Sequence, residues 1–216
     1  MEACPSTSPP PAPRDSEASK ARLLKAATDE FAARGIAGAR VDRIGAAAEV
    51  NKALIYTYFG NKEQLFDAVM DAHVARVLDE VPFTPEDLPG YAGRLFDFLL
   101  ANPHQLRLAT WHRLERSGTD REPQGLEASM RQKTAAITQS QTDGLLTTAF
   151  SPEDLLVFTL ALANAWMPTS PMATNDQAAE QTRQHRDAVV EAVRRLVAGT
   201  STTQPLQELG TAVSTT

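Results

Sequence analysis

The chain has 216 residues, of which 42% are hydrophobic, so it is long enough to bury a core in one medium domain or two small ones. Its single cysteine, Cys4, cannot form an internal disulfide, and a reducing compartment is therefore expected. The opening residues lack the basic start and apolar stretch of a secretory signal. The longest apolar run, residues 155–167, is shorter than the roughly 20 residues that cross a bilayer, so we expect a cytoplasmic protein with no membrane partner.

The formal net charge of −6 by itself argues against a nucleic-acid partner, but the charges are unevenly distributed. Residues 14–63 carry nine Lys and Arg against seven Asp and Glu, a balance of +2. Residues 64–216 carry 12 against 19, a balance of −7. The sequence thus joins a mildly basic segment to an acidic body.

Helical periodicity fills the chain between two polar ends. Residues 1–14 are rich in Pro and Ser, residues 200–216 are similarly polar, and both are expected to be disordered tails. Between them no stretch shows the strict alternation and β-branched enrichment of a strand. The fold class is therefore predicted to be all-α.

The first helices are expected over residues 19–34, 41–48, 51–59 and 61–81. Gly35 can end the first of them, and Asn51 can cap the third after a tight turn at Glu49. Gly60 then breaks the chain, and Asn61 with Gln64 three residues later is typical of a capping box.

Five more helices are expected in the second part of the chain. Asn102 and Ser151 each precede a proline, a combination typical of a capped helix start. The predicted ranges are 89–101, 103–117, 123–142, 152–166 and 176–198.

Residues 41–59 have the pattern of a helix-turn-helix, in which two short helices are joined by a tight turn and the second helix enters the major groove of DNA. Ile44, Val50, Ile55 and Phe59 are placed to pack the two helices together. The side chains left pointing outward are Lys52, Ala53, Leu54, Tyr56 and Thr57. Because paired helices of this kind occur in many proteins, the spacing alone leaves DNA binding open.

The residues themselves are more specific than the spacing. The stretch VDRIGAAAEVNKALIYTYFGNKEQLFDAVM, residues 41–70, with KARLLKAATDEFAARGIAGARV before it, resembles the signature of the TetR (tetracycline-repressor-like) family. The resemblance is dense over residues 19–72. It implies a helix-turn-helix DNA-binding domain at 15–64 and a helical ligand-binding and dimerisation domain at 65–199. It also implies a homodimeric repressor that occupies a palindromic DNA operator until a small-molecule effector releases it.

The resemblance assigns roles to particular residues of the head. Residues 55–59 correspond to the recognition helix and Lys62 to a phosphate-binding lysine, while Tyr56 and Tyr58 are expected to meet the DNA backbone. Three departures are evident. Glu49 occupies the turn position usually held by Gly, and Arg40 replaces the usual Ser or Thr cap. Ala53 and Leu54 replace the common Gly-Thr pair. The expected DNA-binding set is Arg40, Lys52, Ala53, Leu54, Tyr56, Thr57, Tyr58 and Lys62.

The segment 155–167 is apolar nearly all round, so one of its faces is expected to meet a partner subunit. A central helix of a single core is the alternative. The resemblance favours a dimer interface made with the last helix, through Leu155, Phe158, Leu162, Val189, Val193 and Leu196.

An apolar effector is expected to bind between body helices, where large side chains and a few polar groups occur together. The candidates are Phe96, Trp111, His112, Glu115 and Trp166, each of which has core or surface packing as its alternative role. The four histidines show no metal-ligand spacing, so neither a metal nor a cofactor is expected. No catalytic signature is present, which leaves an enzyme built from dispersed residues, or a ligand-binding module without DNA, as the other classes.

Overall fold

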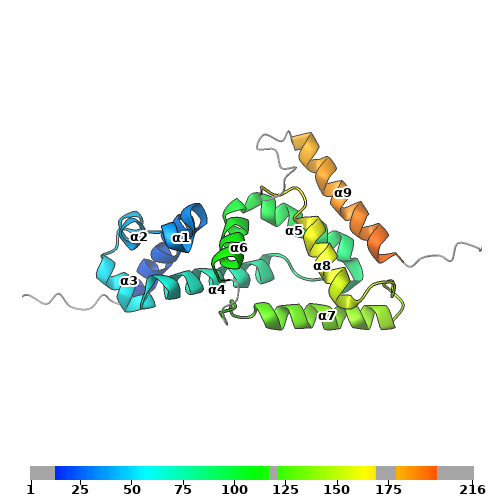
Figure 1. Ribbon diagram of the computed structural model, residues 1–216, viewed down its shortest axis with the longest axis horizontal. Helices are drawn as coiled ribbons and strands as arrows, with labels where there is room; N and C mark the ends of the chain where they lie inside the picture. The colour runs from blue at the N-terminus through cyan, green and yellow to red at the C-terminus, as the bar shows by residue number, and fades with distance from the viewer. Residues whose placement is uncertain (1–12, 117–120, 169–178, 199–216) are drawn as a thin grey trace, which may run out of the picture.

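The computed structural model describes residues 13–116, 121–168 and 179–198, and these form an all-α fold with a small head and a larger body (Figure 1). Most of the two predicted tails, with Cys4, lies outside the described residues. The order is α1 to α9, with one 3-10 turn before α5. None of the described helices is both long and apolar enough to span a membrane.

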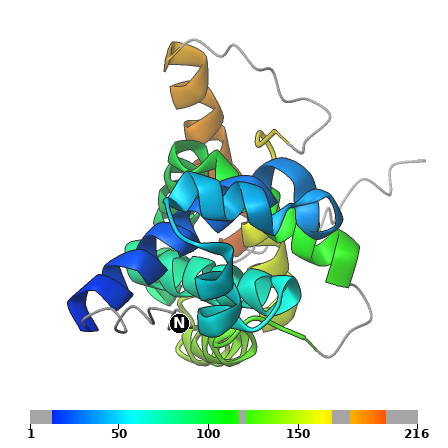
Figure 2. The same cartoon turned by 90° about the vertical axis from the view of Figure 1, so that its left-hand side faces the viewer.

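The head consists of α1 (Pro13–Gly38), α2 (Val41–Ala48), α3 (Lys52–Phe59) and the start of α4 (Lys62–Glu80). Figure 2 shows these helices from the end of the molecule. Their core is apolar and fully enclosed, with Phe31 and Phe66 meeting edge to face at a centroid distance of 5.1 Å. The same core includes Met70 and Leu108 of α6, so it extends beyond residue 64, where the sequence placed the end of the head.

Gly35 interrupts α1 where the sequence predicted its end. The backbone there has φ 67° and ψ −177°, a conformation almost restricted to glycine, and one short turn continues to Gly38. At its other end α1 begins at Pro13 rather than near Ser19. Ser19 therefore lies inside the helix, where its hydroxyl accepts a hydrogen bond from Arg22.

The turn between α2 and α3 is tight and holds a non-glycine residue in a left-handed conformation. Glu49 has φ 54° and ψ 42°, which is uncommon for a residue with a side chain. The N–H of Val50 donates to the Gly45 carbonyl at 3.0 Å, and a Cβ on Gly45 would lie 3.0 Å from the Val50 carbonyl oxygen. A small residue at position 45 thus lets the two short helices approach closely.

The predicted caps hold the ends of these helices. The Asn51 side chain accepts from the Ala53 N–H at 2.9 Å, and the Asn61 side chain accepts from the Gln64 N–H at 2.8 Å. Arg40 occupies the cap position of α2 without any side-chain hydrogen bond, as its chemistry predicts. The capping acceptors therefore fix where α3 and α4 begin.

The body is built around α5 (Leu88–Ala101), which packs against both α9 (Ala179–Val197) and α8 (Pro152–Ala163), and those two helices also contact each other (Figure 1). The remaining helices are α6 (Pro103–Arg116), which leans on α1, and α7 (Leu126–Thr142), which packs on α8. A 3-10 turn, Pro85–Asp87, leads into α5, whose start is capped by the Asp87 carboxylate at 2.9 Å from the Gly90 N–H.

Candidate nucleic-acid interface and body cavities

One face of α3 is open to solvent at the end of the head. Lys52, Ala53, Tyr56 and Thr57 are exposed, and Tyr56 keeps 45% of its surface. Ile55 and Phe59 point the other way into the head core, where they anchor the helix. A short helix whose inner residues are buried presents its outer residues as a rigid surface, which is the requirement for reading base edges in a groove.

Two residues predicted for this face are less exposed to solvent than the others. Leu54 and Tyr58 are half-buried, and the Tyr58 hydroxyl accepts a hydrogen bond from Ser16 Oγ of α1 at 3.2 Å. Tyr58 also packs edge to face on Phe59. In the protein without DNA, the Tyr58 phenol therefore links α3 to α1.

Lys52, at the start of α3, forms an ion pair with a residue of α2. Its Nζ lies 2.8 Å from an Asp42 Oδ1 of α2, and both side chains remain well exposed. The hydrogen bond to Lys52 lowers the pKa of the Asp42 carboxyl, and the same bond raises the pKa of Lys52. An exposed pair of this kind is screened by solvent and exchanges partners readily, so the ammonium remains available to a phosphate or a base.

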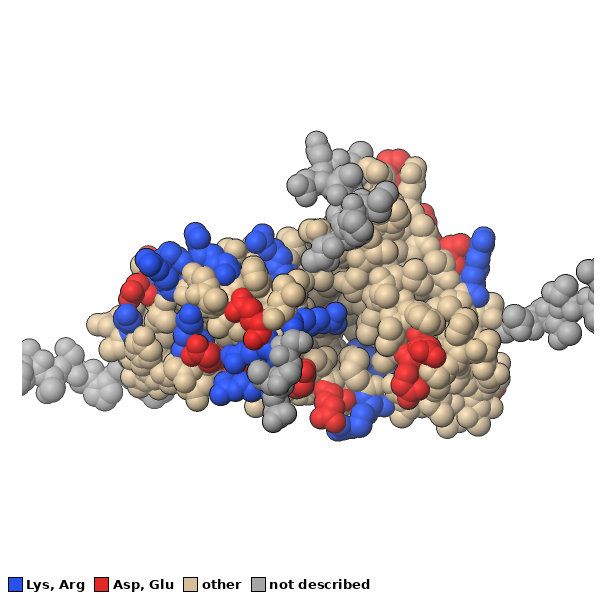
Figure 3. All heavy atoms as spheres, viewed as in Figure 1, with Lys and Arg blue, Asp and Glu red and all other residues tan. Residues whose placement is uncertain are grey.

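The other two predicted cations lie together at the loop between α1 and α2. Lys62 Nζ donates to the Ala39 carbonyl at 3.5 Å, and the next residue along, Arg40, projects an exposed side chain. The Arg40 backbone is fixed separately by a 3.0 Å hydrogen bond to Glu30. Lys and Arg side chains gather over the head in the face shown in Figure 3.

The structure corrects half of the predicted dimer residues. Leu155, Val189 and Val193 are at most 3% exposed because they fill the core between α5, α8 and α9 of one protomer. A side chain that is already enclosed has no surface left for a second subunit. Leu162 and Leu196 are half-buried against the same core, and Phe158 is 40% exposed.

The outward face of α8 is nevertheless apolar. Val157 is 58% exposed, and Phe158 meets Phe150 edge to face at 5.7 Å between centroids. Ala161, one turn after Val157, is also exposed. This face, defined by Val157, Phe158, Ala161 and Phe150, is where α8 has surface for a partner.

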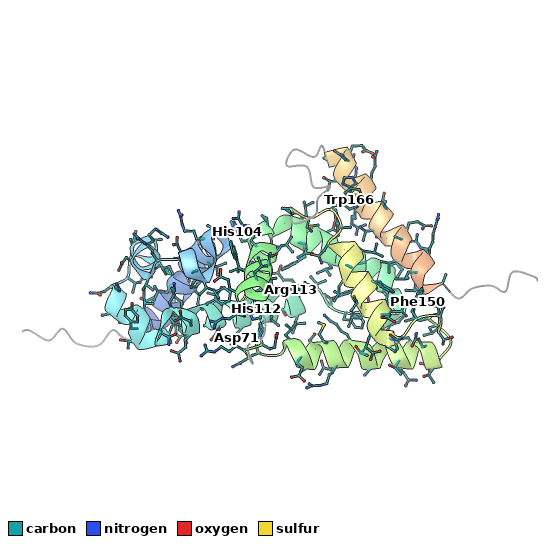
Figure 4. The ribbon with its side chains drawn as sticks, viewed as in Figure 1. Asp71, His104, His112, Arg113, Phe150 and Trp166 are labelled. Atoms are coloured by element: carbon teal, nitrogen blue, oxygen red, sulfur yellow. The ribbon has the colours of Figure 1, made fainter. Side chains whose placement is uncertain are left out.

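The five predicted effector residues do not share one cavity. Phe96 is 1% exposed inside the body core, and it does not line the cavity that includes His112. Trp166 stacks on His185 of α9 at 3.8 Å between centroids, and Figure 4 shows it far from His112. Trp111 lies against Gly35 of α1, whereas its neighbour His112 lines a cavity that does not include Trp111.

Trp111 and Glu115 face α1 and form a contact that the sequence did not predict. The two Glu115 carboxylate oxygens accept from the backbone N–H groups of Ile36 and Ala37, each at 3.0 Å. These groups become free because α1 is broken at Gly35. A Cβ on Gly35 would lie 2.2 Å from Glu115 Oε1 and 2.9 Å from Trp111, so only glycine fits. We call this contact the Glu115 clamp.

His112 lines a body cavity of about 570 Å³, a size that suits a small molecule. It also lies in a stacked orientation against Phe66 of the head core, with 6.3 Å between the ring centroids. Arg113, which also lines the cavity, is labelled beside His112 in Figure 4. The lining comes from α4, α6, the segment before α7 and the first residue of α7: Met70, His73, Val74, Ala109, His112, Arg113, Arg116, Glu122, Pro123 and Leu126.

The wall of this cavity includes a half-buried histidine, His73. His73 Nδ1 contacts the side-chain oxygen of Gln105, which is itself buried. Burial lowers the pKa of His73, which favours the neutral imidazole. Among the described residues, no three His, Cys, Asp or Glu side chains lie close enough to hold a metal ion.

The head and the body each match a protein-family model. Residues 23–69 match the bacterial regulatory proteins of the tetR family, and residues 87–195 match the tetracyclin repressor-like C-terminal domain. The first match covers most of α1 together with α2, α3 and the start of α4. The second match covers the body from α5 into α9.

Individual proteins are similar over most of the chain. The HTH-type transcriptional repressor SCO4008 of Streptomyces coelicolor is 40% identical over 191 residues, which are 86% of this chain and 98% of that protein. The HTH-type transcriptional repressor Rv3405c of Mycobacterium tuberculosis is 44% identical over 59 residues, or 27% of this chain and 31% of that protein. The solved structure of SCO4942, a candidate transcriptional regulator from S. coelicolor, is 37% identical with a TM-score of 0.73, and covers 83% of this chain and 98% of its own.

Proposed function

Because the chain belongs to the tetR family of bacterial transcriptional regulators, we propose that it is a homodimeric repressor that a small-molecule effector releases from a palindromic operator. The exposed face of α3 reads the major groove, and Lys62 and Arg40 contact phosphates. The observation that carries this proposal is the rigid, solvent-open face of Lys52, Ala53, Tyr56 and Thr57.

The chemistry of that face suits DNA. Lysine supplies charge for phosphate or for guanine acceptors, the Tyr56 hydroxyl can donate to a phosphate, and Ala53 offers a methyl group for thymine. Thr57 donates its hydroxyl to the Ala53 carbonyl at 3.0 Å inside α3. Its proton is therefore used within the helix, which favours a methyl contact to the base.

A second copy of the chain is proposed to pack on the outward face of α8. Val157 and Phe158 are large apolar side chains left in water by the protomer, and burial of such surface favours association. Two-fold symmetry would place the two α3 helices on half-sites about 34 to 36 Å apart, or a multiple of that spacing.

The 570 Å³ cavity is the proposed effector site because α6 connects it to the head. His112 and Arg113 line the cavity, while Glu115 on the same helix holds the backbone of α1. A ligand that shifts α6 would therefore also shift α1. A tenfold loss of operator affinity requires about 1.4 kcal/mol of coupling, and DNA must weaken the effector by the same factor.

Two substitutions in the head test the DNA-binding part of the proposal. Lys62→Ala is expected to weaken binding to every duplex and to lower the salt slope by about one unit per subunit, because a phosphate contact is independent of sequence. Thr57→Ala is expected to cost roughly 1 to 3 kcal/mol at one operator position and little elsewhere. Fluorescence anisotropy across a salt titration and a set of single-base variants measures both.

Lys25 of α1 supplies the matched control. It is also a lysine of the head, but it is exposed and paired with Asp29 on its own helix. Lys25→Ala should leave the affinity near that of the wild type. If Lys62→Ala and Lys25→Ala gave the same salt slope as the wild type, Lys62 would hold no phosphate.

A further inference from the structure

A lysine of α7 is buried in the body without a carboxylate. Lys133 is only 7% exposed, although lysines are almost never fully buried unless they are paired. No carboxylate of the described residues lies within 4.0 Å of its Nζ, and the ammonium takes part in none of the ion pairs found there. Its charge is therefore not neutralised inside the described part of the protein.

The groups that do surround Lys133 are neutral. Its Nζ donates to the Tyr91 hydroxyl at 3.2 Å and lies 5.7 Å and 5.5 Å from the ring centroids of Phe83 and Tyr91. Burial raises the pKa of Tyr91 to about 12, so the phenol carries no negative charge. Burial also lowers the pKa of Lys133. The two rings favour a cation at this point without balancing it.

Lys133 lines a cavity of about 560 Å³ that shares no lining residue with the 570 Å³ cavity. Most of its wall is apolar, and Ser129 lies one turn before Lys133 on the same helix. Ser129 is buried, and its hydroxyl forms no hydrogen bond with the described residues. The lining residues are Leu78, Val81, Phe83, Pro85, Gly125, Ala128, Ser129, Gln132, Lys133 and Ala136.

We propose that this cavity binds a small organic carboxylate, whose anionic group pairs with Lys133 and whose apolar body lies against Leu78, Val81 and Phe83. A carboxylate accepts from the ammonium and from the Ser129 hydroxyl, so it supplies the missing countercharge and uses the free donor. The apolar walls then bury the rest of the molecule.

The donor set favours a carboxylate over a phosphate. One ammonium and one or two hydroxyls match the single charge and two oxygens of a carboxylate. A phosphate ester carries close to two charges and more acceptor oxygens, and the cavity offers no arginine to hold them. A neutral ligand would leave the ammonium unpaired in a site from which it had displaced water.

Calorimetry of the full-length protein without DNA tests this site directly. The probes are butanoate, octanoate and 4-phenylbutanoate, with 1-octanol as the neutral partner of octanoate. At least one acid with a long body is expected to bind the wild type. Lys133→Met keeps an unbranched side chain and removes the charge, and it is expected to weaken that acid roughly tenfold to hundredfold while leaving 1-octanol unchanged or tighter.

Further variants distinguish binding at this cavity from binding elsewhere on the protein. Ala128→Trp should block both the acid and the alcohol, because it fills the cavity while leaving Lys133 in place. Lys25→Met, which removes an exposed lysine of the head, should change neither. Equal affinity of the acid for the wild type and Lys133→Met would overturn the proposal, as would no binding of any acid at millimolar concentration.

The readout does not depend on operator release. His112→Ala, in the proposed effector cavity, should leave acid binding at Lys133 intact. Failure of the effector proposal is therefore distinguishable from failure of this one.

Discussion

Val193→Asp is expected to unfold the protomer rather than to separate two folded subunits. Val193 is 0% exposed in the core between α5, α8 and α9, where no cation is available to an introduced carboxylate. Burying an unpaired charge belongs to the class of substitutions that cost roughly 4 to 5 kcal/mol or more. Because a domain is stable by about 5 to 15 kcal/mol, most of that stability would be lost. Circular dichroism under urea titration measures the loss.

Val157→Asp is the matched control, since it makes the same substitution on α8 where Val157 is 58% exposed. It should keep the folded protomer within about 0.5 kcal/mol of the wild type, because surface changes away from special features have small effects. If the outward face of α8 joins two subunits, light scattering at fixed protein concentration should show a folded monomer. A Val157→Asp protein that stayed dimeric would place the interface elsewhere, and a Val193→Asp protein as stable as the wild type would contradict the core.

Gly35→Ala is expected to destabilise the junction between head and body. The backbone conformation alone, φ 67° with ψ −177°, costs a non-glycine residue roughly 1 to 3 kcal/mol. The new methyl group would also overlap Glu115 Oε1, so the Glu115 clamp would open and release the N–H groups of Ile36 and Ala37. The urea midpoint should fall, and operator affinity should fall with it.

Gly125→Ala separates the two causes. Gly125 also has a positive φ, 78°, but a Cβ there would meet no atom within 4 Å. Gly125→Ala should therefore lower the free energy of unfolding only by the cost of the backbone conformation, about 1 kcal/mol. Glu115→Gln, which retains one acceptor oxygen, should lie between the wild type and Glu115→Ala. A stability in Glu115→Ala equal to that of the wild type would mean that the Glu115 clamp contributes nothing.

Local signals in the sequence predicted the head well. Capping chemistry at Asn51 and Asn61 and the break at Gly35 depend on neighbouring residues, and the structure confirms all three. The all-α fold and the helix-turn-helix followed from periodicity together with these breaks. The family resemblance of residues 41–70 is confirmed by the family model that matches residues 23–69.

Long-range contacts were not predictable in the same way. Glu115 and Ile36 are 79 positions apart, and no local sequence pattern near either residue predicts their hydrogen bond. Periodicity showed that residues 155–167 are apolar all round, but it could not say which face meets the protomer's own core. Leu155 turned inward and Val157 outward because α5 and α7 cover one side of α8.

The buried position of Lys133 was hidden for a similar reason. A lysine between Gln132 and Thr134 is typical of an exposed helix face. Phe83 of the connector before α5 and Tyr91 of α5 itself come close to its ammonium only through the tertiary packing of these segments on α7. The cavity beside it is a product of tertiary packing, and no motif marks it.

The central claim is that the exposed face of α3 selects a DNA sequence. The most direct measurement is fluorescence anisotropy with a duplex chosen by the protein from a random pool, competed against a shuffled duplex of the same composition at fixed salt. The chosen duplex should contain two inverted half-sites and bind about a thousandfold or more tighter than the shuffled one. Replacing Lys52, Tyr56 and Thr57 by alanine should abolish that preference without unfolding the head. Equal affinity of the wild type for both duplexes would contradict the account.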